Sequence, residues 1–315
     1  MRITAYCLGY QHWTVLPHQL KDDFDRMKHC GFNAVAFSFS ESEMRYARRT
    51  FELQVGLAHE AGLKVFVVPS RLGGRLAGAP LMPSIWLAQN PEAQIPVTEK
   101  GQDPLACLEN EAFREWIKDF METLLRDYPL DGIIWDEPKG LDVRSLHPDT
   151  IKRFGENPTV EQMENGFADF LEDLTAHCCG IRDDLEVTLF NMPHVSKSAS
   201  LKLAALPGID YAGFDGRLAP ESFFHEKTRD AKTRAAQAWE RTLEESRQTG
   251  KKTFILLENM LMPKTVMDEY EENLENFLAN HRPDHLSLYF YGHNNEDPEG
   301  IYQIMKKAMR KHLPR

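Results

Sequence analysis

The feature of this sequence that most constrains its fold is a regular alternation of short apolar segments with longer amphipathic ones. After the first apolar segment, Leu20, Phe24 and Met27 recur at helical spacing, and Gly31 ends that helix. Strands that alternate with helices pair in parallel through right-handed crossovers. The pattern predicts eight strands, at residues 3–7, 33–39, 64–69, 132–135, 186–190, 209–214, 253–257 and 285–291.

Eight strand–helix units are the number that closes a TIM barrel, so we predict an α/β protein with a single (β/α)8 barrel domain over residues 1–315. The alternative is a doubly wound open sheet, which is disfavoured because no Gly-rich phosphate loop follows the first strand. A long Gly/Pro-rich loop, residues 70–108, follows strand three, and loops of this length are often lids or binding loops. The remaining helices are expected at residues 46–61, 111–126, 160–178, 199–205, 221–248, 267–278 and 301–311.

The bulk composition excludes several classes of partner. A net charge of −11 argues against a nucleic-acid partner. No apolar run approaches the ~20 residues that span a bilayer, so we expect no membrane partner. The five cysteines lack CxxC spacing, which favours free thiols, and the chain starts in a strand without a leader-like segment. We therefore expect a cytoplasmic protein without a metal or other cofactor, and homo-oligomerisation stays open.

Carboxylates follow two of the predicted strands directly. Residues 131–138 read Asp-Gly-Ile-Ile-Trp-Asp-Glu-Pro, so Asp136 and Glu137 end strand four, and Glu258 ends strand seven. In a TIM barrel the active site is built from these carboxyl-terminal strand ends. Paired carboxylates there are what glycoside hydrolysis uses. Because adjacent strand residues point to opposite faces, we expect only one of Asp136 and Glu137 to face the pocket.

Other polar and aromatic side chains fall at the same ends of the strands. The candidate substrate-binding residues are Trp13, Glu41, Arg71, Asn191, His194, Asp215, Tyr289 and Tyr291. Trp86, in the long loop, is the aromatic residue we single out for stacking on a sugar ring. Arg71, Arg75, Lys139 and Arg217 are interpreted as ordinary loop charges, with recognition of an acidic sugar as the alternative. The charged run at residues 229–234 is interpreted as a solvated helix face.

The sequence Trp135-Asp136-Glu137-Pro138 resembles the Trp-Asn-Glu-Pro signature that ends strand four in clan A retaining glycoside hydrolases. In that clan this glutamate is the acid/base, and a glutamate that ends strand seven is the nucleophile. The resemblance therefore implies Glu137 as acid/base and Glu258 as nucleophile. Asp136 departs from the signature, because the usual Asn donates a hydrogen bond to the sugar and a carboxylate can only accept one. A looser likeness to poorly characterised bacterial glycoside hydrolase barrels covers residues 90–132.

We thus expect a glycoside hydrolase that cleaves oligosaccharides or glycosides with two carboxylates and a retaining mechanism. In barrels of the α-fucosidase and α-galactosidase type, an Asp ending strand four is the nucleophile, which would give that role to Asp136, with Asp215 or Glu258 as the acid. A second alternative is a metal-dependent sugar isomerase or epimerase with Asp136, His194, Asp215 and Glu258 as ligands. A third is a catalytically silent barrel that binds sugar.

Overall fold

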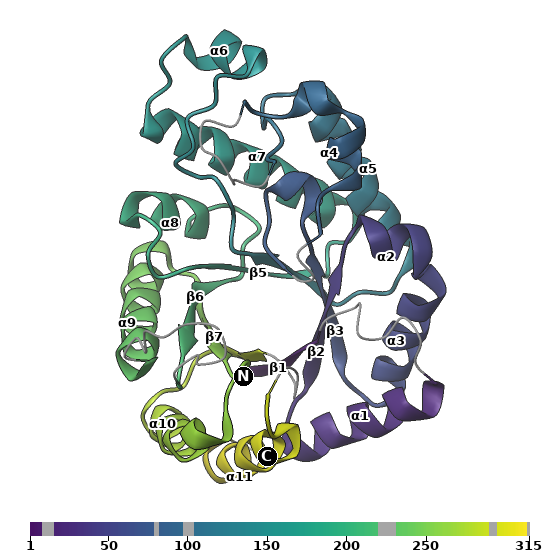
Figure 1. The fold of residues 1–315 in the computed structure, drawn as a ribbon, viewed down its shortest axis with the longest axis vertical. Coiled ribbons are helices and arrows are strands. Elements are labelled where there is room, and N and C mark those ends of the chain that lie inside the picture. Colours follow the sequence, from purple (N-terminus) through teal and green to yellow (C-terminus); the bar gives the residue numbers. More distant parts are fainter. Residues whose placement is uncertain (8–15, 79–81, 97–103, 220–230, 290–294, 314–315) are drawn as a thin grey trace.

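Eight parallel strands close into a barrel in chain order, with β1 hydrogen-bonded to both β2 and β8 (Figure 1). The computed structural model describes residues 1–7, 16–78, 82–96, 104–219, 231–289 and 295–313. The predicted (β/α)8 TIM barrel is confirmed. Its strands are β1 (Arg2–Cys7), β2 (Ala34–Phe39), β3 (Lys64–Pro69), β4 (Gly132–Asp136), β5 (Glu186–Asn191), β6 (Tyr211–Arg217), β7 (Lys252–Glu258) and β8 (His285–Tyr289).

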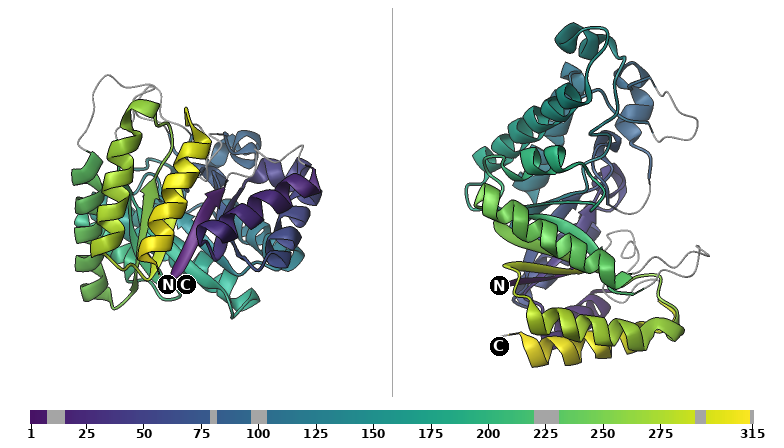
Figure 2. Two further views of the ribbon diagram at one scale, coloured as in Figure 1. Left: turned by 90° about the horizontal axis from the view of Figure 1, so that it is seen from below. Right: turned by 90° about the vertical axis from the view of Figure 1, so that its left-hand side faces the viewer.

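Helices cover the outside of the barrel on all sides (Figures 1 and 2). They are α1 (Pro17–Cys30), α2 (Glu41–Tyr46), α3 (Arg48–Glu60), α4 (Ile85–Gln89), α5 (Glu111–Asp127), α6 (Pro148–Phe154), α7 (Val160–Ile181), α8 (Lys197–Ala204), α9 (Ala231–Thr249), α10 (Met267–Asn280) and α11 (Pro298–His312). The helix predicted at 46–61 is α3, and a further short helix, α2, precedes it, where Ser40 and Glu43 form a capping box. The segment predicted as a loop before residue 160 contains α6.

Strand β6 begins and ends later than the predicted 209–214. Asp210 lies before the strand, and its carboxylate accepts a hydrogen bond from the Val187 N–H. At the other end, Asp215, Gly216 and Arg217 stay in register with β7. The polar end of this strand is therefore part of the sheet, which fixes Asp215 and Arg217 on regular backbone.

Two apolar cores lie on the two faces of the closed sheet. Inside the barrel pack the inward residues Tyr6, Ile134, Phe190, Phe254 and Leu256, among others. The larger core lies between the strands and the helices, and Trp135 belongs to it, donating its indole N–H to Thr175 of α7 at 3.1 Å. Because side chains alternate along a strand, an inward Ile134 and an outward Trp135 direct Asp136 into the barrel.

Polar side chains also fill the amino-terminal end of the barrel. Glu186 forms ion pairs with Arg2, at 2.5 Å, and with Lys64. One layer higher, the His285 ring lies between the hydroxyls of Thr4 and Thr188, at 2.9 and 3.2 Å. Burial lowers the pKa of His285 well below its usual value, so the ring is neutral. These groups close the floor of the barrel, and its opposite end carries the strand-end carboxylates.

The loops after β3 and β4 extend beyond the barrel at one side, where they carry α4 and α6 (Figures 1 and 2). Buried Arg75 joins their described parts: its Nε donates to Ala106 O at 2.7 Å, and one terminal nitrogen lies 3.4 Å from Gly140 O. The Ala77 N–H donates to Asp136 O at 2.8 Å, which ties the first loop to the end of β4. We call this pair of contacting segments the joined loops.

Close packing of β6 against β7 makes Gly213 a sensitive position. A Cβ at Gly213 would lie 1.9 Å from the Phe254 carbonyl oxygen, which is backbone and cannot move aside. We expect Gly213→Ala to lower the free energy of unfolding by about 3 kcal/mol, the upper end of typical overpacking. Urea denaturation measures this. Gly56→Ala on exposed α3, where a Cβ meets nothing within 4 Å, is the control and should stabilise by about 0.5–1 kcal/mol. Equal effects of the two substitutions would contradict the packing argument.

Candidate active site

Four carboxylates gather at the carboxyl-terminal mouth of the barrel. Asp136 and Glu137 come from β4 and the residue after it, Asp215 from β6, and Glu258 from the last position of β7. Asp136 and Asp215 are buried, and only 1% of the Asp215 side chain is exposed. The side chains of Glu137 and Glu258 are 17% and 11% exposed. The two glutamates are therefore the carboxylates of this group that reach solvent.

Asp136 is held inside the barrel by a tyrosine from the opposite part of the sheet. The Tyr6 hydroxyl donates a hydrogen bond to its Oδ2. Burial, and next the charge of Glu137, raise the pKa of Asp136 to about 7. The pKa of Tyr6 is raised well above its usual value by burial and then by Asp136. Tyr6 is absent from the residues predicted from the sequence, although its alternation with inward Thr4 could have indicated it.

The backbone of Glu137 does not have the dihedral angles of a strand. Its φ is +38°, in the left-handed region that costs a residue other than glycine of order 1–3 kcal/mol. Its N–H donates to Phe190 O at 3.0 Å, and the Lys139 ammonium lies 2.6 Å from its Oε2. The charge of Glu137 also raises the pKa values of Asp136 and Asp215, both inside the barrel. The strict alternation expected for two adjacent carboxylates therefore does not apply here, because the backbone turns at Glu137.

Two arginines balance the charge of Glu258 and Asp215. Arg217 Nε donates to Glu258 Oε2 at 2.6 Å, from the neighbouring strand β6. Arg234 of α9 lies 2.6 Å from Asp215 Oδ2 and 3.7 Å from Glu258 Oε1. Burial, and next the charge of Glu258, still raise the pKa of Asp215 well above its usual value. The interpretation of residues 229–234 as a solvated face is wrong for Arg234, whose guanidinium turns into the mouth.

Two candidate substrate-binding residues, Glu41 and His194, differ in their surroundings. Both Glu41 oxygens accept hydrogen bonds at 2.6 Å, one from the Ser84 hydroxyl and one from the Trp86 N–H, so Glu41 fixes the start of α4. His194 is exposed in the turn after β5. In the described part of the chain, neither side chain is hydrogen-bonded to a mouth carboxylate, so their role in substrate binding stays a prediction.

Asn191 and Tyr289 end β5 and β8 on different faces of the sheet. Asn191 pairs with Phe214, whose ring belongs to the outer core, and this alternation turns the buried Asn191 toward the helices. Tyr289 packs against the Tyr6 ring with centroids 4.8 Å apart, so it lies at the mouth. Trp13 and Tyr291 lie outside the described residues.

The rim cations are mostly engaged. Arg75 is buried between the joined loops, Lys139 pairs with Glu137, and Arg217 pairs with Glu258. Arg71, at φ +59°, donates its Nε to Gly78 O at 2.8 Å. Arg71 and Lys139 also line a cavity of about 660 Å³ between the joined loops, together with apolar Leu87, Leu105 and Val143.

Trp86, predicted from the sequence to stack on a sugar ring, is half-buried and packs against α5. Its ring stacks on Trp116 of α5 with centroids 5.0 Å apart and lies 5.7 Å from the ring of Phe113. These contacts place the half-buried Trp86 against the outer core, so its selection as a sugar platform stays a prediction. A large aromatic side chain in a long loop stabilises the fold when part of its ring is buried, because burial removes apolar area from water.

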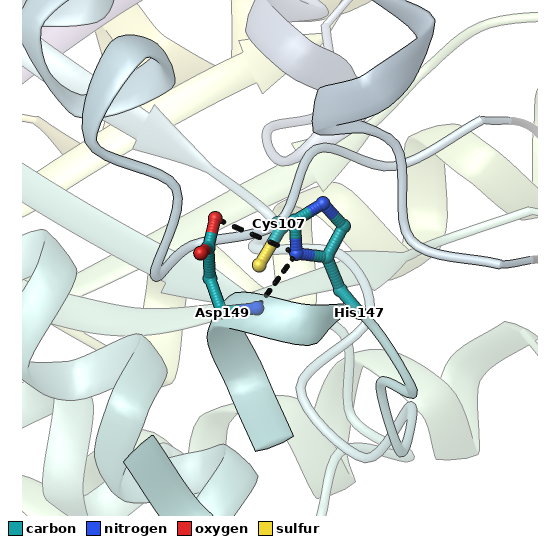
Figure 3. A group of neighbouring side chains, drawn as sticks. All are labelled: Cys107, His147 and Asp149. Atoms are coloured by element: carbon teal, nitrogen blue, oxygen red, sulfur yellow. Dashed lines mark hydrogen bonds and ion pairs between the residues drawn. The ribbon is translucent and has the colours of Figure 1, made fainter. Parts of the chain in front are cut away.

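One group of His, Cys, Asp and Glu side chains in the described part of the chain is compact enough to hold a metal ion. It consists of Cys107, His147 and Asp149, in the joined loops (Figure 3). The ligand set suggested for an isomerase is arranged differently, since Asp215 and Glu258 face guanidinium groups and His194 is exposed. At the mouth, the chemistry of the residues is that of carboxylates balanced by arginines.

No protein-family model matches the sequence, and no curated protein matches it. Solved structures do match: a β-galactosidase from the haloarchaeon Halorubrum lacusprofundi has a TM-score of 0.67 at 12% identity over 99% of this chain and 58% of that one. The β-amylase catalytic domain from Paenibacillus polymyxa gives 0.62 at 9% identity, covering 99% of both chains. An endo-1,4-β-mannanase from Rhizomucor miehei gives 0.61 at 12% identity, covering 98% and 94%. The likeness is one of fold: this chain has the (β/α)8 barrel of these glycoside hydrolases and spans about three fifths of the first one's length.

The raised pKa of Asp136 makes the stability of the protein depend on pH. The folded state keeps a proton up to about pH 7 that the unfolded chain releases near pH 4, so stability falls as pH rises through this window. Three pKa units correspond to about 4 kcal/mol at most. Asp136→Asn removes this dependence and keeps an acceptor for Tyr6. We expect urea denaturation at pH 4, 6 and 8 to show the variant gaining on the wild type as pH rises; parallel curves would contradict this.

Proposed function

We propose that this protein is a glycoside hydrolase that cleaves O-glycosidic bonds with Glu137 and Glu258. The observation that carries the proposal is that Glu137, directly after β4, and Glu258, at the end of β7, are the mouth carboxylates that reach solvent, on the same rim of the barrel. Arg234 lies 3.7 Å from Glu258, and the charge of Glu137 reaches both Arg234 and Asp215. Carboxylates paired in this way serve glycoside hydrolysis. The likeness to barrels whose names are those of glycosidases supports the same reaction class.

In the proposed mechanism Glu258 is the nucleophile. Its ion pairs with Arg217 and Arg234 are those of a carboxylate and hold its oxygens in place. An oxygen of Glu258 attacks the anomeric carbon as the bond to the leaving oxygen breaks, and Glu137 supplies the proton to that oxygen. Water activated by Glu137 then hydrolyses the glycosyl ester, which gives overall retention of configuration.

Asp136 fits a positioning role better than that of nucleophile. It is buried and bonded to Tyr6, and with a pKa of about 7 it spends much of its time protonated near neutral pH. A nucleophile needs the ionised form. A protonated Asp136, in contrast, offers the hydrogen-bond donor that an Asn would offer at this position. We infer that Asp136 contacts the substrate as a neutral acid.

A cytoplasmic location is part of the proposal. The four cysteines whose side chains the structure describes, Cys30, Cys107, Cys178 and Cys179, are free thiols, as is usual in a reducing compartment. Among the described helices, none has the length and apolar character needed to cross a membrane. The expected partner is a carbohydrate substrate.

The roles of the two glutamates can be tested with nitrophenyl glycosides and unactivated oligosaccharides. Glu258→Gln should lower kcat by about three orders of magnitude or more on every substrate, because the nucleophile is lost. Glu137→Gln should lower kcat/KM by about 10²–10⁴ on oligosaccharides and less on dinitrophenyl glycosides, whose leaving group needs little protonation. Proton NMR of the first product formed should show retention.

The matched control is Glu52→Gln, on exposed α3, which should leave turnover unchanged. Wild-type turnover that survives in Glu137→Gln and Glu258→Gln would exclude the two-glutamate mechanism. Metal-dependent conversion of a free sugar into its isomer or epimer, without cleavage of any glycoside, would favour the isomerase alternative, and binding of sugars without turnover would favour a silent barrel.

Asp136→Asn tests the positioning role. If a neutral Asp136 donates a hydrogen bond to substrate, wild-type kcat/KM should fall as pH rises through about 7, because Asp136 ionises. The Asn side chain donates at every pH, so the variant should keep its activity and lose this alkaline fall. An inactive Asp136→Asn variant that is fully folded would assign Asp136 an ionised role instead.

A further inference from the structure

We propose that Cys107, His147 and Asp149 form a structural zinc site that fastens the joined loops together. The thiol comes from the loop after β3, and the imidazole and carboxylate come from the loop after β4 (Figure 3). Cys107 and His147 are buried, and Asp149 is half-buried. This site is separate from the carboxylates at the barrel mouth and does not depend on the proposed hydrolysis.

The histidine is already set in the tautomer that a metal ligand needs. His147 Nε2 lies 2.7 Å from Glu92 O, and a carbonyl oxygen only accepts, so Nε2 carries the hydrogen. Nδ1 is therefore the unprotonated nitrogen, and it faces Cys107 and Asp149 (Figure 3). Ligating histidines usually donate their other ring N–H to a carbonyl or carboxylate in this way. In the metal-free form, Nδ1 accepts the Asp149 N–H at 3.1 Å and caps α6.

The distances suit a tetrahedral ion after a small contraction. The three ligand atoms lie within 4.8 Å of one another, and His147 Nδ1 is 3.6 Å from Asp149 Oδ2. Zinc bonds of about 2.0–2.3 Å at tetrahedral angles separate neighbouring ligand atoms by roughly 3.3–3.7 Å. The Nδ1–Oδ2 pair already has this spacing, so the sulfur needs to move inward by about 1 Å at most.

A fourth oxygen ligand is close by. Glu109 Oε2 lies 3.5 Å from the Cys107 sulfur, and the Glu109 side chain is only 8% exposed. Thr150 donates to the same oxygen at 2.9 Å, and Asn110 donates to Asp149 Oδ2 at 3.0 Å, so both carboxylates are oriented by neighbours. Thiolate, imidazole and carboxylate together favour Zn²⁺ over Mg²⁺ or Ca²⁺. On binding, the metal displaces the thiol proton of Cys107 to solvent.

A metal ion at this site would affect how the joined loops are held beside the barrel mouth. The joined loops carry Arg75, Lys139 and the turn at Glu137, and the contacts between them include the hydrogen bonds of Arg75 and the packing of Val143 against Ile95, Leu105 and Cys107. An ion shared between the loops would hold them in register beside the mouth, because its bonds form only when both loops are in place.

The test uses the full chain, freed of metal by a chelator and then titrated with zinc or cobalt alone. Wild-type protein should bind one ion, give a cobalt spectrum with a thiolate charge-transfer band, and melt at higher temperature when loaded. Cys107→Ser should remove the thiolate band and weaken zinc binding at least tenfold. His147→Asn keeps a good helix cap but loses the imidazole ligand, so it should fold and bind zinc at least tenfold more weakly.

Cys179→Ser on α7 is the matched control and should bind zinc as the wild type does. If Cys107→Ser fails to fold, His147→Asn decides the question. The proposal is overturned if the wild type takes up no zinc, if the cobalt spectrum lacks the thiolate band, or if His147→Asn binds zinc with wild-type affinity.

Discussion

Closure of the sheet between β1 and β8 is the constraint on which the rest of the structure depends. It forces the inward side chains of eight strands into one narrow interior, so the last inward residue of each strand meets the others at the mouth. Tyr6 of β1 reaches Asp136 of β4 only because the ring is closed. Asp215 and Glu258 lie beside one another because β6 and β7 are neighbouring strands that pair in register as far as Arg217 and Glu258.

Gathering acids in so small a space opposes folding, and the structure offsets this cost in two ways. Arg217 of β6 forms an ion pair with Glu258, and Arg234 of α9 forms one with Asp215. Within the described residues, Asp136 forms no ion pair with an arginine, and its burial raises its pKa to about 7. A buried charge is tolerated when it is paired or neutralised, and this mouth uses pairing with arginine on β6 and β7 and neutralisation on β4. An ionised carboxylate paired with arginine, such as that proposed for Glu258, is suited to nucleophilic attack, whereas a neutral Asp136 is suited to donating a hydrogen bond.

The sequence was sufficient for the barrel, because apolar strands and helical spacing repeat eight times and each repeat is local. It also placed Asp136, Glu137, Asp215 and Glu258 at strand ends, where the structure has them. It could not predict what depends on distant contacts. Arg234 looks like any charge in a polar run, and only the packing of α9 turns it inward. Trp86 looks like a loop aromatic, and its packing against Trp116 depends on where α5 lies. The Cys107–His147–Asp149 group joins two loops, and the spacing of residues in the sequence does not predict that these loops come into contact.

The left-handed backbone at Glu137 lowers the stability of the fold, because a glutamate is strained in this conformation. Glycine would adopt that φ without strain, while the only ion pair described for this side chain is with a partly exposed lysine and contributes at most about 1 kcal/mol. Removing the carboxylate in favour of glycine would thus leave the barrel no weaker, and by this balance firmer. The proposed role of Glu137 therefore comes at a cost to the scaffold of order 1–3 kcal/mol, which a glycine at the same φ would not carry.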